Sequence, residues 1–170
     1  MTSKIRVAGP KDYDEVWRLL MLGHDENALF PLSPGKVKWF VNRMLDPDSI
    51  PPEETGVRGI IGVVGEVGSL EGLAFIITGE FWYTEAKHLE ELIIFVDPEH
   101  RRSDHAKSLL NWAKSLPDTT GLPLLTGILS NDRVEAKCRL YQRILPKIGE
   151  FFFVSPKGGN VMPALVAASS

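Results

Sequence analysis

Two adjacent arginines at the start of an amphipathic segment are the clearest chemical feature of this sequence. Arg101 and Arg102 follow an apolar run, residues 89–96, which is rich in Ile, Val and Phe and is ended by Pro98. That run predicts a buried strand, and apolar residues at helical spacing from position 106 onward predict a helix. The free N–H groups and the dipole at a helix N-terminus attract anions. The segment therefore predicts a site for a phosphate-bearing ligand at the end of a buried strand.

Two adjacent glutamates, Glu90 and Glu91, lie at the beginning of the same apolar run. Successive side chains of a strand point to opposite faces of the sheet, so one of the two can face a cleft while the other faces a helix or solvent. A carboxylate in a cleft can act as a general base. Two solvated glutamates at the start of a strand would look the same in the sequence, so both interpretations stay open.

The composition predicts a single globular domain. The chain has 170 residues, of which 44% are hydrophobic and 24% are charged. Its net charge of −3 gives no general attraction to nucleic acid or anionic membranes. The lone cysteine, Cys138, excludes an internal disulfide framework, and no apolar leader or membrane-length run is found. We therefore expect a cytoplasmic protein with no nucleic-acid partner and no membrane association.

The histidines do not point to a metal. His24, His88, His100 and His105 show no recognised metal-ligand spacing, and no pair of cysteines accompanies them. We expect no metal, and we expect His105 to cap its helix or to contact phosphate.

Strand-like and helix-like segments alternate along the chain. We predict one domain over residues 1–155 and a Gly-, Ala- and Ser-rich tail over residues 156–170. The predicted strands are residues 4–8, 59–64, 71–83, 89–96, 122–129 and 150–154. The predicted helices are residues 11–22, 33–45, the segment after Arg102, and 134–145.

The segment that contains the two arginines resembles the acetyl-CoA motif of the GNAT superfamily of acyl-CoA-dependent N-acyltransferases. In that family a strand ending in Val is followed by a short turn and by Gln/Arg-x-x-Gly-x-Gly/Ala at a helix start. Here Val96 is followed by Arg101-Arg102-Ser103-Asp104-His105-Ala106, with Asp104 where the family usually has glycine. The order of predicted elements over residues 5–154 is also similar to that of the family.

The resemblance implies a fold and a reaction. The fold would be of the α/β (α+β) class: a mixed, mostly antiparallel twisted sheet flanked by about four helices, with a bulge in the fourth strand. The reaction would be the transfer of an acetyl group from acetyl-CoA, the cosubstrate, to a primary amine by direct attack. The acceptor would be a small-molecule or peptide amine.

The resemblance also implies site residues. Tyr141 would protonate the departing thiolate, and Glu90, six residues before the strand-ending Val96, or its neighbour Glu91 would be the base. The residues implied for binding the cosubstrate are Phe95, Val96, Arg101, Arg102, Ser103, Asp104, His105, Ala106 and Asn131. The resemblance also allows deprotonation through water without a dedicated base. Without the resemblance, Asn131 would be a helix cap and Tyr141 a packing aromatic.

Asp104 keeps a second interpretation open. A carboxylate in this loop would repel the pyrophosphate unless it turns back to cap its own helix, which is the conformation we expect. If it does repel the ligand, the chain is a degenerate GNAT-fold module that serves as a CoA-binding or protein-interaction unit. A mononucleotide-binding protein is a weaker third possibility, since the sequence has no Gly-rich phosphate motif.

The acceptor side is the least defined in the sequence. Asp25 and Glu26 form an acidic pair that can attract a cationic amine, although an exposed polar loop would look alike. The aromatic run Phe81-Trp82-Tyr83 can wall an acceptor pocket, support a homodimer contact or simply pack within the fold.

Overall fold

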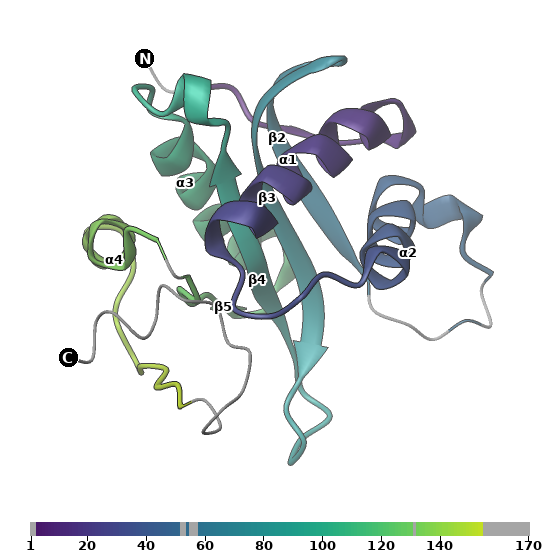
Figure 1. The fold of residues 1–170 in the computed structure, drawn as a ribbon. Coiled ribbons are helices and arrows are strands. Elements are labelled where there is room, and N and C mark those ends of the chain that lie inside the picture. The colour runs from purple at the N-terminus through teal and green to yellow at the C-terminus, as the bar shows by residue number, and fades with distance from the viewer. Residues whose placement is uncertain (1–2, 52–53, 55–57, 131, 155–170) are drawn as a thin grey trace.

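The protein is built on one five-stranded mixed sheet (Figure 1). The computed structural model describes residues 3–51, 54, 58–130 and 132–154. The strands follow the chain order across the sheet: β1 (Arg6–Val7), β2 (Gly59–Glu66), β3 (Ser69–Glu80), β4 (Lys87–Val96) and β5 (Leu124–Leu125). Neighbours from β1 to β4 are antiparallel, whereas β5 is parallel to β4. The predicted mixed, mostly antiparallel sheet is confirmed.

Helices cover both faces of the sheet. The described residues form four α-helices: α1 (Tyr13–Asn27), α2 (Pro34–Leu45), α3 (His105–Thr120) and α4 (Val134–Gln142). Short 3-10 helices occupy Pro10–Asp12, Pro47–Ser49 and Pro98–His100. In Figure 1, α1 crosses in front of the sheet and α3 lies behind it. The number of helices agrees with the prediction, although α1 runs five residues beyond its predicted end.

The core is divided between these two layers by strand alternation. Leu73 and Phe75 of β3 pack with buried residues of α1 and α2, including Leu19 and Val41. Ala74, which lies between them in sequence, packs on the α3 face instead. Each central strand is therefore buried on both sides, which accounts for its nearly continuous apolar sequence.

A bulge in β4 changes which side chains face each layer. Phe75 of β3 pairs with Ile93, but Ile76 pairs with Glu91, so Leu92 has no partner in the register. In a regular strand, Leu89 and Ile93 would face the same side, because they are four residues apart. Because of the bulge, Leu89 packs on the α3 face and Ile93 on the face covered by α1. The bulge that the GNAT resemblance implied is present, and it sets the face to which Glu91 belongs.

Strands β4 and β5 run side by side for a short distance only. Their paired residues are Leu89 with Leu124 and Glu90 with Leu125. The prediction of a strand over residues 122–129 was therefore too long, because the bulge at Leu92 bends β4 away and ends the ladder. Beyond this pairing the two chains diverge.

The last predicted strand, residues 150–154, is not formed. The described part of this segment is irregular, and its Phe152 and Val154 are almost fully exposed. Its aromatic residues favour a strand by intrinsic propensity, but a strand also needs a partner edge. Here Phe153 contacts Phe30 edge to face, with ring centroids 6.2 Å apart, in place of a ladder.

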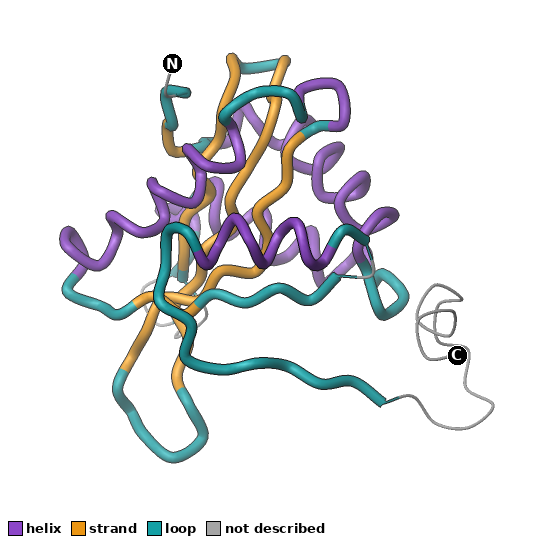
Figure 2. Tube along the Cα trace, turned by 90° about the vertical axis from the view of Figure 1, so that its left-hand side faces the viewer, coloured by secondary structure: helices purple, strands orange, loops and turns teal. Residues whose placement is uncertain are grey.

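The hairpin that joins β3 to β4 extends beyond the helices. Figure 2 shows this pair of strands and its closing loop below the helical layers. The loop carries the predicted aromatic run, and Trp82 at its tip is 96% exposed. The run is thus not packing within the core.

Candidate active site

The divergence of β4 and β5 opens a large cleft. Its volume is about 1420 Å³, and it is bordered by β4, residues 124–130, α4 and the C-terminal end of α1. Strand β4 runs along the cleft from the hairpin at one end to the predicted anion loop at the other. The sequence-predicted groups can therefore be located along one continuous groove.

Glu91 and Tyr141 meet in the middle of this cleft. The Tyr141 hydroxyl donates a hydrogen bond of 2.8 Å to Glu91 Oε2. Glu91 is only 8% exposed, and this burial raises the pKa of its carboxyl to about 7, although the hydrogen bond from Tyr141 acts in the opposite direction. Burial and the nearby Glu91 carboxylate raise the pKa of Tyr141 well above its usual value. Two residues implied by the motif for opposite proton transfers are thus in direct contact.

Glu90 is in a different environment from Glu91. It borders the same cleft but is exposed, and it lies on the opposite face of β4. The structure therefore distinguishes between the two glutamates, which the sequence left as alternatives. Glu91 is buried beside Tyr141, and Glu90 faces the layer of α1 and α2.

Part of the predicted anion loop borders the opposite end of the cleft. Arg101, Ser103 and Ala106 line it together with Phe95 and Val96 of β4. Among the described residues that line the cleft, Arg102, Asp104 and His105 do not appear. Asn131 lies outside the described residues, so its predicted role stays a prediction.

Arg101 is already engaged by a carboxylate. Its guanidinium forms an ion pair with Glu26 near the end of α1. It also lies 5.7 Å from the centre of the Phe95 ring. Arg101, which the motif implies for binding the cosubstrate phosphates, is thus paired with Glu26, which belongs to the acidic pair predicted for the acceptor side.

Asp104 occupies the N-cap position of α3 but does not cap it as expected. Its side chain makes no capping hydrogen bond, and Ser103 Oγ accepts the His105 N–H at 3.3 Å instead. The backbone angles of Asp104, φ −85° and ψ 8°, explain this, because a capping side chain needs an extended backbone. The capping prediction for Asp104 was therefore wrong.

The His105 side chain points into the protein. Its Nδ1 lies 2.6 Å from Ser3 Oγ, and its Nε2 lies 2.5 Å from Glu71 Oε2 on β3. Both ring nitrogens therefore contact protein groups, and the ring does not cap the helix; its contact with phosphate stays a prediction. The ring instead ties the start of α3 to the sheet.

A second cation that the sequence analysis did not single out lies near Arg101. Lys137 Nζ contacts Asn27 Oδ1, and it donates to Ser130 Oγ and to the Asp132 carbonyl, both at 2.9 Å. Burial lowers the pKa of Lys137. The signal that could have found it is its place four residues before Tyr141, which puts both side chains on one face of α4.

An ion-pair network fixes the end of β4 from which the anion loop begins. Arg18 of α1 donates to Asp97 Oδ2 at 2.6 Å and to the Leu70 carbonyl at 2.8 Å, and it also pairs with Glu15. Asp97 in turn accepts the Glu99 N–H at 3.0 Å. Helix α1, strand β3 and the loop are thus held in one arrangement.

Comparison with known proteins gives the fold a name. No protein-family model and no curated protein sequence matches the chain. Solved structures do match. A ribosomal-protein-alanine N-acetyltransferase from Brucella melitensis biovar Abortus aligns with a TM-score of 0.61 and 17% identity, over 90% of this chain and 97% of that one. The chain has the GNAT fold.

Two further structures support the same assignment. An aminoglycoside acetyltransferase from an uncultured soil metagenomic sample aligns with a TM-score of 0.62 and 17% identity, over 92% of this chain and 99% of that one. A GNAT family acetyltransferase from Staphylococcus aureus aligns with a TM-score of 0.55 and 14% identity, over 91% of this chain and all of that one. The GNAT fold is thus shared along almost the full length of each structure.

The described residues show neither of two other kinds of site. None of the helices they form is long and apolar enough to cross a bilayer. Within the same part of the chain, no group of three or more His, Cys, Asp or Glu side chains is arranged to hold a metal ion.

Proposed function

We propose that this protein is an N-acetyltransferase that moves an acetyl group from acetyl-CoA to a primary amine. The observation that carries the proposal is the hydrogen bond between Tyr141 and the buried Glu91, in the cleft between the diverging strands of a GNAT fold. Acetyl-CoA supplies the activated thioester. The protein has to deprotonate the amine and to protonate the leaving thiolate.

Glu91 is the proposed general base. A primary amine is largely protonated at neutral pH and cannot attack a carbonyl until it loses that proton. The pKa of Glu91, raised by burial to about 7, lies close to the operating pH, where a general base is most effective. Glu90 is exposed to solvent and lacks such a contact with Tyr141, so it is the weaker candidate.

Tyr141 is the proposed general acid. Its raised pKa keeps the hydroxyl protonated, so the residue remains a proton donor at neutral pH. The hydrogen bond to Glu91 orients the hydroxyl within the cleft. Because the two groups are joined, a proton that Glu91 removes from the amine can be balanced by the one that Tyr141 gives to sulfur.

The anion loop fits the phosphate part of acetyl-CoA. The first turn of α3 presents N–H groups without helical partners, and Arg101 and Lys137 supply positive charge at this end of the cleft. The cleft volume of about 1420 Å³ exceeds the ~300–1,000 Å³ of typical small-ligand pockets, as a ligand of this length requires. Binding would require Arg101 to exchange Glu26 for phosphate.

The acceptor is proposed to be a small-molecule or peptide amine. One solved neighbour is named as a ribosomal-protein-alanine N-acetyltransferase and another as an aminoglycoside acetyltransferase, so both kinds of amine occur among proteins of this fold.

Two observations favour the alternative, a GNAT-fold module that has lost turnover. Glu26 holds Arg101, and an acidic residue, Asp104, stands where the motif has glycine. Both features oppose an incoming phosphate. If they prevail, the protein would bind CoA weakly or act through protein contacts.

Thiol release from acetyl-CoA in the presence of a panel of primary amines tests the proposal. We expect amine-dependent release of CoA by the wild type, and its loss in the Glu91→Gln and Tyr141→Phe variants. A thermal-shift titration with acetyl-CoA should raise the melting temperature, because a ligand that binds only the native state stabilises it. Stabilisation by CoA without turnover of any amine would favour the degenerate module instead.

A further inference from the structure

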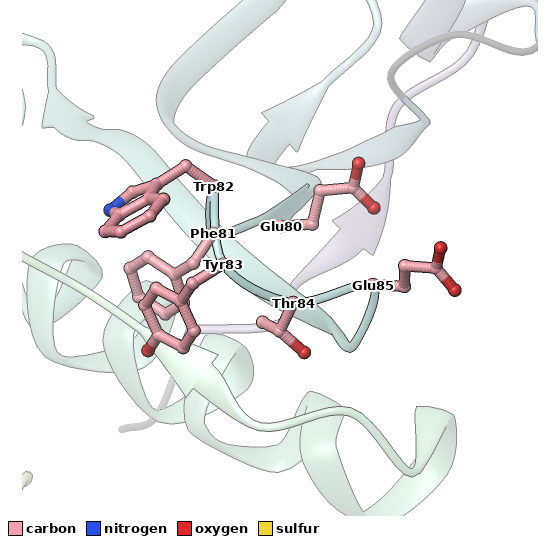
Figure 3. Close-up of a pocket in the computed structure, with 6 residues that line it drawn as sticks. All are labelled: Glu80, Phe81, Trp82, Tyr83, Thr84 and Glu85. Carbon is pink, nitrogen blue, oxygen red and sulfur yellow. The ribbon is translucent and has the colours of Figure 1, made fainter.

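The two ends of the cleft carry opposite charge. Arg101, Arg133 and Lys137 border the end formed by the anion loop and α4. Glu90 borders the end formed by the β3–β4 hairpin; Glu80 borders it too, but its side chain points to the other side of the hairpin loop (Figure 3). Lys147 also borders the cleft, but it pairs with Glu150. The hairpin end is therefore suited to a cation.

A largely buried histidine, His88, lies at this acidic end. His88 is 6% exposed and borders the cleft. Its ring stacks on Phe81, with centroids 4.7 Å apart. Neither ring nitrogen is among the fully buried polar atoms that lack a partner in the described residues, so the ring can offer a nitrogen to a ligand in the cleft.

Glycine at position 79 allows His88 and Glu90 to converge on one point. Gly79 is paired with His88 across the hairpin. A Cβ atom at Gly79 would lie 3.0 Å from Glu90 Oε2 and 3.1 Å from His88 Nε2. A carboxylate oxygen and an imidazole nitrogen therefore reach the same small space, which a side chain at position 79 would fill.

Aromatic rings form the outer wall of this space. Phe81, which stacks on His88, also stacks on Tyr83, with centroids 5.5 Å apart and ring planes inclined by 7°. Figure 3 shows the two rings lying against each other at the hairpin tip, with the Glu80 and Glu85 side chains on the far side of the loop. Because Phe81 is stacked with both Tyr83 and His88, these rings form an apolar wall beside the space.

We propose that the acceptor carries a second positively charged group, and that this group binds between Glu90 and His88 beside Phe81. The inference rests on the proposed function and names its substrate class: a diamine, or an amine with another cationic centre. Glu90 and Glu91 are neighbours on opposite faces of β4, and both border the cleft. An amine that reaches Glu91 between the diverging strands would leave its second cation at Glu90.

Cadaverine and pentylamine form a matched pair for the test, because they differ only in the second amino group. We expect the kcat/KM of the wild type for cadaverine to exceed that for pentylamine by about 10-fold or more, the effect of one charge-assisted hydrogen bond. The ratio should fall toward one in Glu90→Gln, which keeps the shape of the side chain. It should also fall in Gly79→Ala, which fills the space between the two polar atoms.

Glu66→Gln is the matched control. It removes the same charge at the end of β2, outside the residues that border the cleft, and should keep the wild-type ratio. Equal kcat/KM for the two amines in the wild type would overturn the inference. So would an equal loss for both amines in Glu90→Gln, because that pattern would make Glu90 a general base.

Calorimetric titration of both amines into the protein with CoA bound separates this inference from the proposed function. Tighter binding of cadaverine that is lost in Glu90→Gln supports the second cation site even if no acetyl group is transferred. Failure of cadaverine to bind more tightly than pentylamine, including no measurable binding of either, overturns it.

Discussion

The middle and the anion-loop end of the cleft differ in how ready they are for a ligand. In the middle, Glu91 and Tyr141 already share a hydrogen bond, and burial brings the pKa of the Glu91 carboxyl to about 7. At the anion loop, the cation expected to meet phosphate is paired with Glu26. The groups proposed for proton transfer are thus preorganised, whereas the proposed phosphate site must exchange an internal partner for its ligand. Under the proposed function, Glu26 competes with the cosubstrate for Arg101.

The largest expected effect is that of Glu91→Gln. Removing a positioned general base costs about 10²- to 10⁴-fold in rate, so kcat should fall by on the order of 1000-fold. In the wild type, kcat/KM should fall as the pH drops below about 7, because Glu91 becomes protonated, and the variant should lack this limb. Steady-state rates from pH 5.5 to 9 provide the measurement.

Stability gives the same substitution an independent readout. The pKa of Glu91 in the folded protein, about 7, lies above the 4.5 of an ordinary glutamate, as in the unfolded chain, so between these values the folded state binds the extra proton. Folding stability is therefore lost as the pH rises between these two values, by about 3 kcal/mol at most. Glu91→Gln should remove this loss, whereas Glu90→Gln, its exposed neighbour, should not. An unchanged pH dependence of unfolding in Glu91→Gln would contradict the environment assigned to Glu91.

The next effect is that of Tyr141→Phe. Loss of the proton donor should lower kcat by about 100-fold and leave the affinity for CoA unchanged. Because the Tyr141 hydrogen bond lowers the pKa of Glu91, its removal should also move the acid limb of the pH profile to higher pH. Tyr13→Phe makes the same change at the start of α1 and should leave both quantities unaltered. Wild-type turnover in Tyr141→Phe would remove Tyr141 from the mechanism.

At the anion loop, Arg101→Ala should weaken CoA binding by on the order of 10-fold, since a charge-assisted hydrogen bond contributes ~1.5–3 kcal/mol. The same change at Arg102, which does not border the cleft, should have a smaller effect. The affinity of the wild type should fall as salt rises. Equal losses of CoA affinity in the two variants, measured by calorimetry, would contradict the larger role expected of Arg101.

Glu26→Gln tests the internal competition directly. If the Glu26 carboxylate competes with phosphate for Arg101, its neutralisation should strengthen CoA binding by a few-fold, because one opposing charge is removed. The gain should disappear in the double variant with Arg101→Ala. Weaker CoA binding in Glu26→Gln would instead mean that Glu26 positions Arg101 for the ligand.

The parts of this molecule that sequence analysis predicted are those set by local patterns. Pro98 ends an apolar run and a helical repeat begins soon after it, so the strand, the loop and the helix could be located from neighbouring residues. The Tyr141–Glu91 bond joins residues 50 positions apart, and the Arg101–Glu26 pair joins residues 75 apart. No local pattern specifies such contacts. The GNAT resemblance implied Tyr141 and Glu91 as candidate site residues but did not predict their contact, and it gave no hint of the second.

The errors have a related cause. The expected strand over residues 150–154 rested on its aromatic residues, but ladder formation depends on a partner edge, which the sequence of the segment does not encode. The expected cap by Asp104 rested on residue type, whereas capping depends on the backbone conformation at that position. In both places the prediction used the average preference of a residue type. The tertiary structure around the segment decided whether the strand or the cap formed.

The smallest expected effect is that of Asp104→Gly, which restores the residue that the GNAT motif usually has. The φ of −85° at Asp104 is not in the left-handed region, so the loop does not need glycine for its backbone. Asp104 is also absent from the residues that border the cleft. For an active acetyltransferase we therefore expect the affinity for acetyl-CoA to change only a few-fold, as measured by calorimetric titration of the two proteins. A degenerate module would instead gain affinity when a misplaced charge is removed. A gain of about 100-fold, equivalent to ~2.7 kcal/mol, would show that the anion loop of the natural protein is blocked by its own carboxylate.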